Sequence, residues 1–198
     1  IAGAVAVTGN KALVPLTSMN RLAIVDTATG KLLGHAPTGV APFGAVVNRA
    51  GTVAWVSNWG GRLPTAKDET APTGLDPSSD RVVIDSRGIA ATGTVTRIDL
   101  ETMRPTHTVE VELHPTALAW DEAHGRLYVA NTNKDSVSII DTQRNAVAGR
   151  IAIQPFAQAA AGIAPTALAL TAAAWWGMSA ASSPPPTCAA TRRWRWAS

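Results

Sequence analysis

The sequence predicts an all-β chain built from about three four-stranded antiparallel sheets. The first observation behind this prediction is an internal repeat of about 42 residues, a period typical of arrays of small sheets. Residues 39–61 align with residues 112–134, and three pairs of positions match: Pro42 with Pro115, Trp55 with Tyr128, and Asn58 with Asn131. In both copies thirteen residues separate the proline from the aromatic residue.

The second observation is an aspartate that recurs at fixed distances: Asp26, Asp99 and Asp141. Asp26 lies thirteen residues after Leu13, and Asp141 lies thirteen residues after Tyr128. In the first and middle copies, the aspartate lies sixteen residues before the next repeat proline. Each aspartate ends the third predicted strand of its copy. A carboxylate at such a place accepts backbone N–H bonds from the following turn, so we interpret these residues as structural rather than as paired catalytic acids.

The third copy shows the four strands most clearly, as PTALAW, RLYVAN, SVSIID and AVAGRIAI, separated by the turn-forming clusters DEAHG, TNKD and TQRN. Apolar residues fall on both faces of this sheet, with Tyr128 on one and Val129 on the other. A sheet that packs between two neighbours in this way is a blade of a β-propeller.

The repeat divides the chain into blades at residues 1–41, 42–114 and 115–164, with the start of a fourth blade at 165. Closed propellers have about four to eight blades. We therefore expect an incomplete propeller, as a fragment or as a chain whose ring is completed by missing blades.

Two insertions interrupt the repeat. The longer, of about 31 residues at 62–93, lies between the second and third strands of the middle blade, and the shorter, around 154–162, lies between the third and fourth blades. In an up-and-down meander these two kinds of connection emerge at the same end of the sheet. We expect both insertions to decorate one face, and we expect much of the longer one to be irregular and exposed.

The candidate binding residues lie in the connections on this face and combine hydrogen-bond donors with an aromatic surface. They are Asn58, Trp59, Arg62, Arg81, His114, Asn133 and Lys134. Solvated loop residues are the alternative interpretation of each.

No motif in the sequence predicts a catalytic residue, a metal or a cofactor. There is no G-x-S-x-G elbow, P-loop or dinucleotide fingerprint, and the histidines have no zinc-site spacing. Asp76 and Asp80 lie four residues apart, but two carboxylates are too few for a calcium site.

Charge argues against nucleic acid as a partner. The chain has 17 Lys and Arg against 14 Asp and Glu, but all three excess positive charges are arginines after residue 171. The body is therefore neutral and offers no electrostatic footprint for phosphate backbones.

The C-terminal segment 172–198 departs from the repeat. It has no acidic residue, four of the seven tryptophans and the single cysteine, Cys188, and we interpret it as a possible frameshift product. A transmembrane helix is the alternative, because no charge occurs from Ile151 to Thr191 and about 20 apolar residues span a bilayer. The run is rich in alanine and contains Pro165, which argues against a membrane span.

The segment YVANTNKDSVSIIDT (128–142) resembles the YVTN-type β-propeller repeat, and residues 55–62 and 13–31 are looser copies. The succession SNWGGRLP, DPSSDRVVID, GIAATGTVTRIDL, LHPTALAW and QPFAQAAAGIAPTALALT is similar to bacterial extracytoplasmic proteins that join such a propeller to an alkaline-phosphatase-like phosphoesterase domain. The resemblance implies a periplasmic or secreted protein whose metal ligands and nucleophile lie in that second domain, which this sequence does not contain.

We expect the chain to be a non-catalytic binding or scaffold segment of an extracytoplasmic phosphoesterase-like protein. Its expected partners are an unidentified ligand or protein on the decorated face, the missing blades and a phosphoesterase domain. The alternative is a propeller enzyme, either a lactonase-like hydrolase or a haem- or quinone-dependent oxidoreductase. That alternative requires ionisable residues near the central axis, where the sequence instead places Pro42, Phe43, Pro115, Thr116, Pro165 and Thr166.

Overall fold

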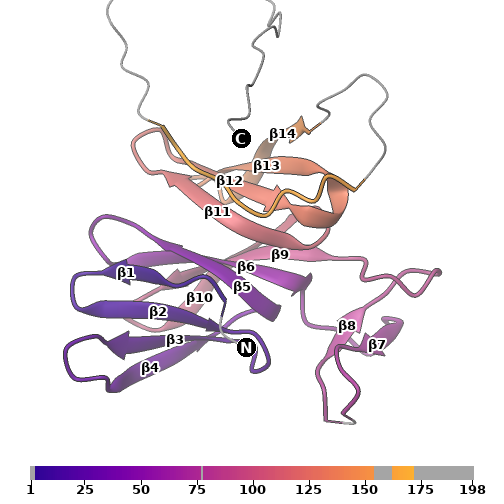
Figure 1. The fold of residues 1–198 in the computed structure, drawn as a ribbon, viewed down its shortest axis with the longest axis horizontal. Coiled ribbons are helices and arrows are strands. Elements are labelled where there is room, and N and C mark those ends of the chain that lie inside the picture. Colours follow the sequence, from indigo (N-terminus) through magenta and orange to yellow (C-terminus); the bar gives the residue numbers. More distant parts are fainter. Residues whose placement is uncertain (1–2, 77, 154–161, 172–198) are drawn as a thin grey trace, which may run out of the picture.

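The computed structural model describes residues 3–76, 78–153 and 162–171, which contain three four-stranded antiparallel sheets in succession (Figure 1). The first sheet has β1 (Ala6–Thr8), β2 (Lys11–Leu16), β3 (Arg21–Asp26) and β4 (Leu32–Pro37). The middle sheet has β5 (Val40–Val47), β6 (Val53–Gly61), β9 (Gly93–Asp99) and β10 (Arg104–Val111). The third sheet has β11 (Pro115–Asp121), β12 (Arg126–Asn131), β13 (Ser136–Asp141) and β14 (Ala146–Ala152). The predicted all-β architecture is confirmed.

The strands of each sheet pair in the order of the chain, which is the predicted meander. Leu13, Trp55 and Tyr128 occupy the second strands β2, β6 and β12, as their common spacing predicts. The one helical element among the described residues is the short 3₁₀ turn η1 (Thr132–Lys134). This part of the chain therefore has no helix that is long and apolar enough to cross a membrane.

The sheets pack face to face through two apolar clusters. The first cluster joins Leu13 and Ile24 of the first sheet to Val56 and Ile98 of the middle sheet. The second joins Trp55 to Leu127, Val129 and Ile140 of the third sheet, with Trp55 and Trp120 edge to face at 6.5 Å. Because neighbouring residues on a strand point to opposite faces, Val56 serves one cluster and the adjacent Trp55 serves the other.

The first strands of the sheets lie side by side, as they do around the axis of a propeller. Ala4 forms a parallel bridge with Gly44 of β5, and Ser57 Oγ donates a hydrogen bond of 2.6 Å to the Thr116 carbonyl of β11. Two sheet faces have no neighbouring sheet in the described structure. We call them the open faces: Val14 and Val25 lie on that of the first sheet, and Tyr128 and Ile139 on that of the third, all partly exposed.

Residues 162–171 run across the third sheet without forming a strand (Figure 1). The Pro165 carbonyl accepts hydrogen bonds from Thr116 Oγ1 at 3.4 Å and from Thr132 Oγ1 at 2.9 Å. The segment thus begins beside β11, where the first strand of a fourth blade is expected.

The long insertion has more structure than the sequence analysis predicts. It contains a two-stranded sheet of β7 (Thr70–Pro72) and β8 (Arg81–Val83), followed by a bridge between Ile84 and Ala90. Val82 and Val83 are buried. The expectation that much of the insertion is irregular and exposed is confirmed outside these strands. The small sheet was not expected, and it forms where the β-branched Val82–Val83 pair folds back on Thr70–Pro72.

Two expectations fall on residues that the structure does not describe. The shorter insertion lies mostly in 154–161, and the off-pattern tail comprises 172–198, so the placement of the first and the origin of the second stay predictions.

Candidate functional site

The connections between second and third strands lie at the same end as the connections between successive sheets, which confirms the meander geometry. The Gly39 N–H, between β4 and β5, donates to Asn58 Oδ1 of β6 at 3.0 Å. In the third sheet, Asp135 lies between β12 and β13, and its carboxylate accepts the Ala164 N–H at 2.9 Å. We call this end of the sheets, which also carries the long insertion, the decorated end.

A recurring contact follows the first and the third sheet at the decorated end. The residues before the repeat prolines, Ala41, His114 and Ala164, all have left-handed φ angles of 51° to 53°. Asn20 Oδ1 accepts the Ala41 N–H at 2.9 Å, as Asp135 does for Ala164. The equivalent position of the middle sheet, seven residues after Trp55, is Arg62, where the insertion has replaced the tight turn.

An aromatic stack takes the place of a hydroxyl bond at the middle junction. Thr17 and Thr132 each donate a hydrogen bond of 2.9 Å, to the Pro42 and Pro165 carbonyls. Trp59 stands at the equivalent position of β6, and its indole stacks on the His114 imidazole with centroids 4.4 Å apart and planes 29° apart. The repeat therefore carries a large aromatic residue where its other copies have threonine.

This stack forms one wall of a cavity of about 560 Å³. The first sheet contributes another wall through its β2–β3 turn, the insertion contributes a third, and Ala41 of β5 and Gly60 of β6 complete the lining. The lining residues are Thr17, Ser18, Ala41, Trp59, Gly60, Thr73, Gly74, Ser78, Ser79, Asp80, Val82, Ala90 and His114. Trp59 keeps 43% of its surface exposed, so its aromatic surface is available at the cavity.

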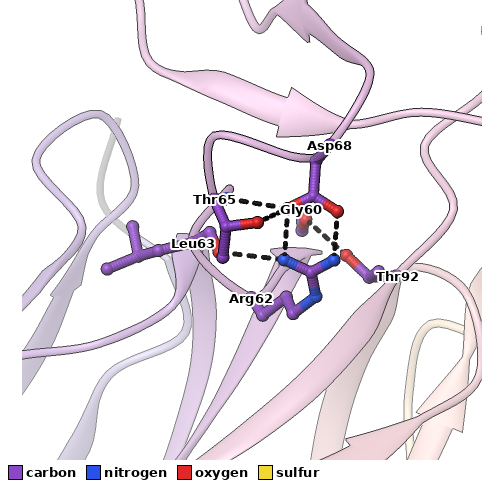
Figure 2. A network of polar contacts seen from close by, with 6 residues as sticks. All are labelled: Gly60, Arg62, Leu63, Thr65, Asp68 and Thr92. Atoms are coloured by element: carbon purple, nitrogen blue, oxygen red, sulfur yellow. Dashed lines mark hydrogen bonds and ion pairs between the residues drawn. The ribbon is translucent and has the colours of Figure 1, made fainter.

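Arg62 and Asp68 hold the base of the insertion (Figure 2). Arg62 Nη1 donates to Asp68 Oδ2 at 2.8 Å, and the Thr65 N–H and hydroxyl donate to the same oxygen, each at 2.7 Å. The Arg62 guanidinium, together with the Thr65 donors, holds the pKa of Asp68 well below its ordinary value. Arg62, a predicted binding residue, thus lies in a contact that closes its own loop.

Asn58 and Arg81 also lie in contacts within the protein. Asn58 is fully buried, and its Nδ2 donates to the hydroxyls of Thr94 and Thr96 at 3.0 and 2.8 Å. Arg81 Nε donates to Thr70 Oγ1 at 2.7 Å across the β7–β8 sheet.

The remaining predicted residues divide between two places at the decorated end. Trp59 and His114 meet in the cavity described above. Asn133 and Lys134 line a second hollow of about 430 Å³, beside Asp135 and Arg87. No sequence pattern pairs Trp59 with His114 or marks the hydroxyl residues of the insertion as part of a site.

The three recurring aspartates are confirmed as turn residues. Each Oδ1 accepts the N–H groups two and three residues further on, at 2.7 to 3.1 Å. The N–H three residues on lowers the pKa of Asp26, Asp99 and Asp141 by stabilising the carboxylate.

Among the described residues, no three histidine, cysteine, aspartate or glutamate side chains form a group that could hold a metal ion. The Ser78 hydroxyl and the Ser78 N–H both donate to Asp76 Oδ1, and the hydroxyl first and then the N–H lower the pKa of Asp76.

No family model matches the sequence, and no curated protein matches it significantly. Solved structures match the fold. The hydrazine synthase of Kuenenia stuttgartiensis superposes with a TM-score of 0.56 and 16% identity, over 75% of this chain and 35% of that one. U3-55K superposes with a TM-score of 0.52 and 9% identity, over 76% of this chain and 39% of that one.

The computationally designed protein Ika8 has a TM-score of 0.47 and 11% identity, over 74% of this chain and 35% of that one. This chain thus spans little more than a third of the length of these proteins. The matches at such low identity concern the fold, and with the three sheets described above they identify the chain as a partial β-propeller.

Proposed function

We propose that this chain is a non-catalytic binding segment of a β-propeller and that its ligand occupies the cavity lined by Trp59 and His114. The observation that carries the proposal is the construction of this cavity. At one sheet junction the repeat replaces threonine with Trp59, and at the same junction the insertion replaces the tight turn with a second wall.

The dimensions and composition of the cavity support binding of a small molecule. Ligand pockets have volumes of about 300–1,000 Å³ and combine apolar and aromatic surface with a few polar groups. This cavity, at about 560 Å³, combines Trp59, Val82 and Ala90 with hydroxyl groups and Asp80.

The lining supports binding more than catalysis. Its ionisable side chains are Asp80 and His114. The imidazole of His114 packs against the Trp59 ring and its Nδ1 is buried. His114 thus supports the Trp59 ring at this site.

A finer attribution rests on the sequence resemblance alone. The YVTN-like repeat and the succession of segments that follows it support an origin in an extracytoplasmic, phosphoesterase-like protein, periplasmic or secreted. In such a protein the missing blades and a phosphoesterase domain would be the partners of this segment. Resequencing the gene around the Thr171 codon tests this attribution. A downstream frame that encodes further blades and a phosphoesterase domain supports it, and a frame that encodes neither contradicts it.

Binding at the cavity is tested with a fluorinated fragment library and ¹⁹F NMR on the full chain. We expect fragments that bind the wild type and lose binding in Trp59→Ala. The matched control is Leu63→Ala, which removes another exposed apolar side chain of the insertion, 55% exposed, outside the cavity lining. Fragments that bind Trp59→Ala as well as the wild type, or an absence of binding fragments, would contradict the proposal.

A further inference from the structure

We propose that the cavity takes a neutral saccharide, with one sugar ring lying on Trp59 and its hydroxyls paired with the insertion. This inference rests on the proposed function and names its ligand class. It comes from the combination of a supported aromatic platform, a hydroxyl-rich wall and one carboxylate around the same hollow.

The platform is Trp59. One face of its indole is covered by His114 at 4.4 Å, so its 43% exposed surface belongs to the other face and the ring edge. The π-face of an aromatic ring carries negative charge density and attracts the weakly positive C–H groups that line one side of a pyranose. The platform is rigid, because Asn58 and Gly60 on either side of Trp59 are buried in β6.

The β2–β3 turn and the insertion present hydroxyl groups to the cavity, and hydroxyl oxygens accept hydrogen bonds from sugar hydroxyls. Five hydroxyl side chains line the cavity: Thr17, Ser18, Thr73, Ser78 and Ser79. Three of them already donate within the protein, Thr17 to the Pro42 carbonyl, Thr73 to the Asp80 carbonyl and Ser78 to Asp76 Oδ1, and therefore offer a ligand their lone pairs.

Asp80 supplies the strongest acceptor of the lining. Its backbone is anchored, because its carbonyl accepts both the N–H and the hydroxyl of Thr73, at 2.8 and 2.9 Å. A carboxylate has two acceptor oxygens and can receive two neighbouring hydroxyls of one sugar ring. Such a pair of charge-assisted bonds fixes the orientation of the ring on the platform.

Other ligand classes fit the lining less well. A phosphate or carboxylate ligand would meet Asp80 without any lysine or arginine among the lining residues. A methylated ammonium is held by a cage of several aromatic rings, whereas this cavity has one indole backed by one imidazole. A purely apolar ligand would cover the Asp80 carboxylate without offering it a hydrogen bond.

The test is a titration of the full chain with neutral methyl pyranosides and disaccharides, followed by tryptophan fluorescence and calorimetry. We expect saturable binding that Trp59→Ala weakens by about tenfold or more and Trp59→Phe largely restores, because phenylalanine keeps an aromatic face. Asp80→Asn, which preserves shape and removes charge, is expected to weaken binding severalfold. Leu63→Ala should bind as the wild type does.

Tetramethylammonium and inorganic phosphate serve as comparison probes for the two charged ligand classes, a methylated ammonium and a phosphate. Saccharide binding should be unchanged between about 50 and 500 mM salt, since the ligand carries no charge. Binding of either comparison probe in a Trp59-dependent manner, without saccharide binding, would overturn this inference. If saccharides fail while Trp59-dependent fragments still bind, the saccharide assignment is wrong and the proposed binding function stands; if both fail, both are wrong.

Discussion

Replacing Asn58 with alanine should destabilise the fold far more than the same change at its repeat equivalent, Asn131. Both residues are fully buried at the end of the second strand, and each Nδ2 donates to two hydroxyls of the third strand. Only Asn58 has a further partner at its oxygen, where Oδ1 accepts the buried Gly39 N–H at 3.0 Å. Asn131 Oδ1 is buried without a partner in the described structure.

The expected difference follows from that one N–H group. Leaving a buried donor unpaired costs about 1–3 kcal/mol, whereas losing a hydrogen bond whose partner can rotate costs about 0.5–1.5 kcal/mol. The threonine and serine hydroxyls can rotate toward other acceptors, and the space left by the side chain is the same in both variants. We therefore expect Asn58→Ala to lower the free energy of unfolding by about 1–3 kcal/mol more than Asn131→Ala.

Urea denaturation followed by tryptophan fluorescence and circular dichroism measures both variants against the wild type. The denaturation midpoint should fall in the order wild type, Asn131→Ala, Asn58→Ala, with a similar slope in all three. Equal midpoints for the two variants would refute the reasoning, because they would show that the Gly39 N–H finds another partner.

Three further predictions concern packing, charge and assembly. Gly93→Ala should lower the melting temperature strongly, because its new Cβ would overlap the Glu112 carbonyl oxygen. Gly34→Ala should lower the melting temperature less, because the atoms nearest to its new Cβ belong to the flexible Met103 side chain. Hydrogen exchange at 62–92 should be faster in Asp68→Asn than in the wild type. In the wild type, this protection should persist at neutral pH and fall in acid. The pKa of Asp68 is lower in the folded protein than its ordinary value of about 4, so its ionised carboxylate stabilises the fold fully above that value. This stabilisation is lost as the pH falls through the folded pKa. The chain expressed alone should oligomerise or aggregate through its open faces, and a monomer in size-exclusion chromatography with light scattering would contradict this.

Repetition explains why so much of the fold could be predicted. Strand positions and the turn aspartates depend on residues close in the chain, and three copies show the same spacing. Gly30 and Asn145 take the left-handed position of equivalent turns, four residues after Asp26 and Asp141, and their residue types favour that conformation. Met103 occupies the third such position with φ of 55°, which its residue type does not indicate.

The candidate site could be predicted only in part. Trp59 and His114 were recognised separately as candidates at the decorated end, but nothing in the repeat indicates that an indole at residue 59 stacks on an imidazole at residue 114. Asn58 and Arg62 were also selected as donors on a loop face. Their buried or paired state depends on Gly39 and Asp68, whose positions follow from the folded chain.

The number of sheets, the order of their strands and the end that carries the long insertion could be read from the amino-acid sequence. These properties follow from local spacing, because strand alternation and turn chemistry act over a few residues and repeat in each copy. The tertiary structure alone decided that the insertion forms a small sheet, that it faces the Trp59–His114 stack, and that a cavity lies between them. Those features depend on contacts between segments far apart in the chain, where the packing of the whole fold selects the partners.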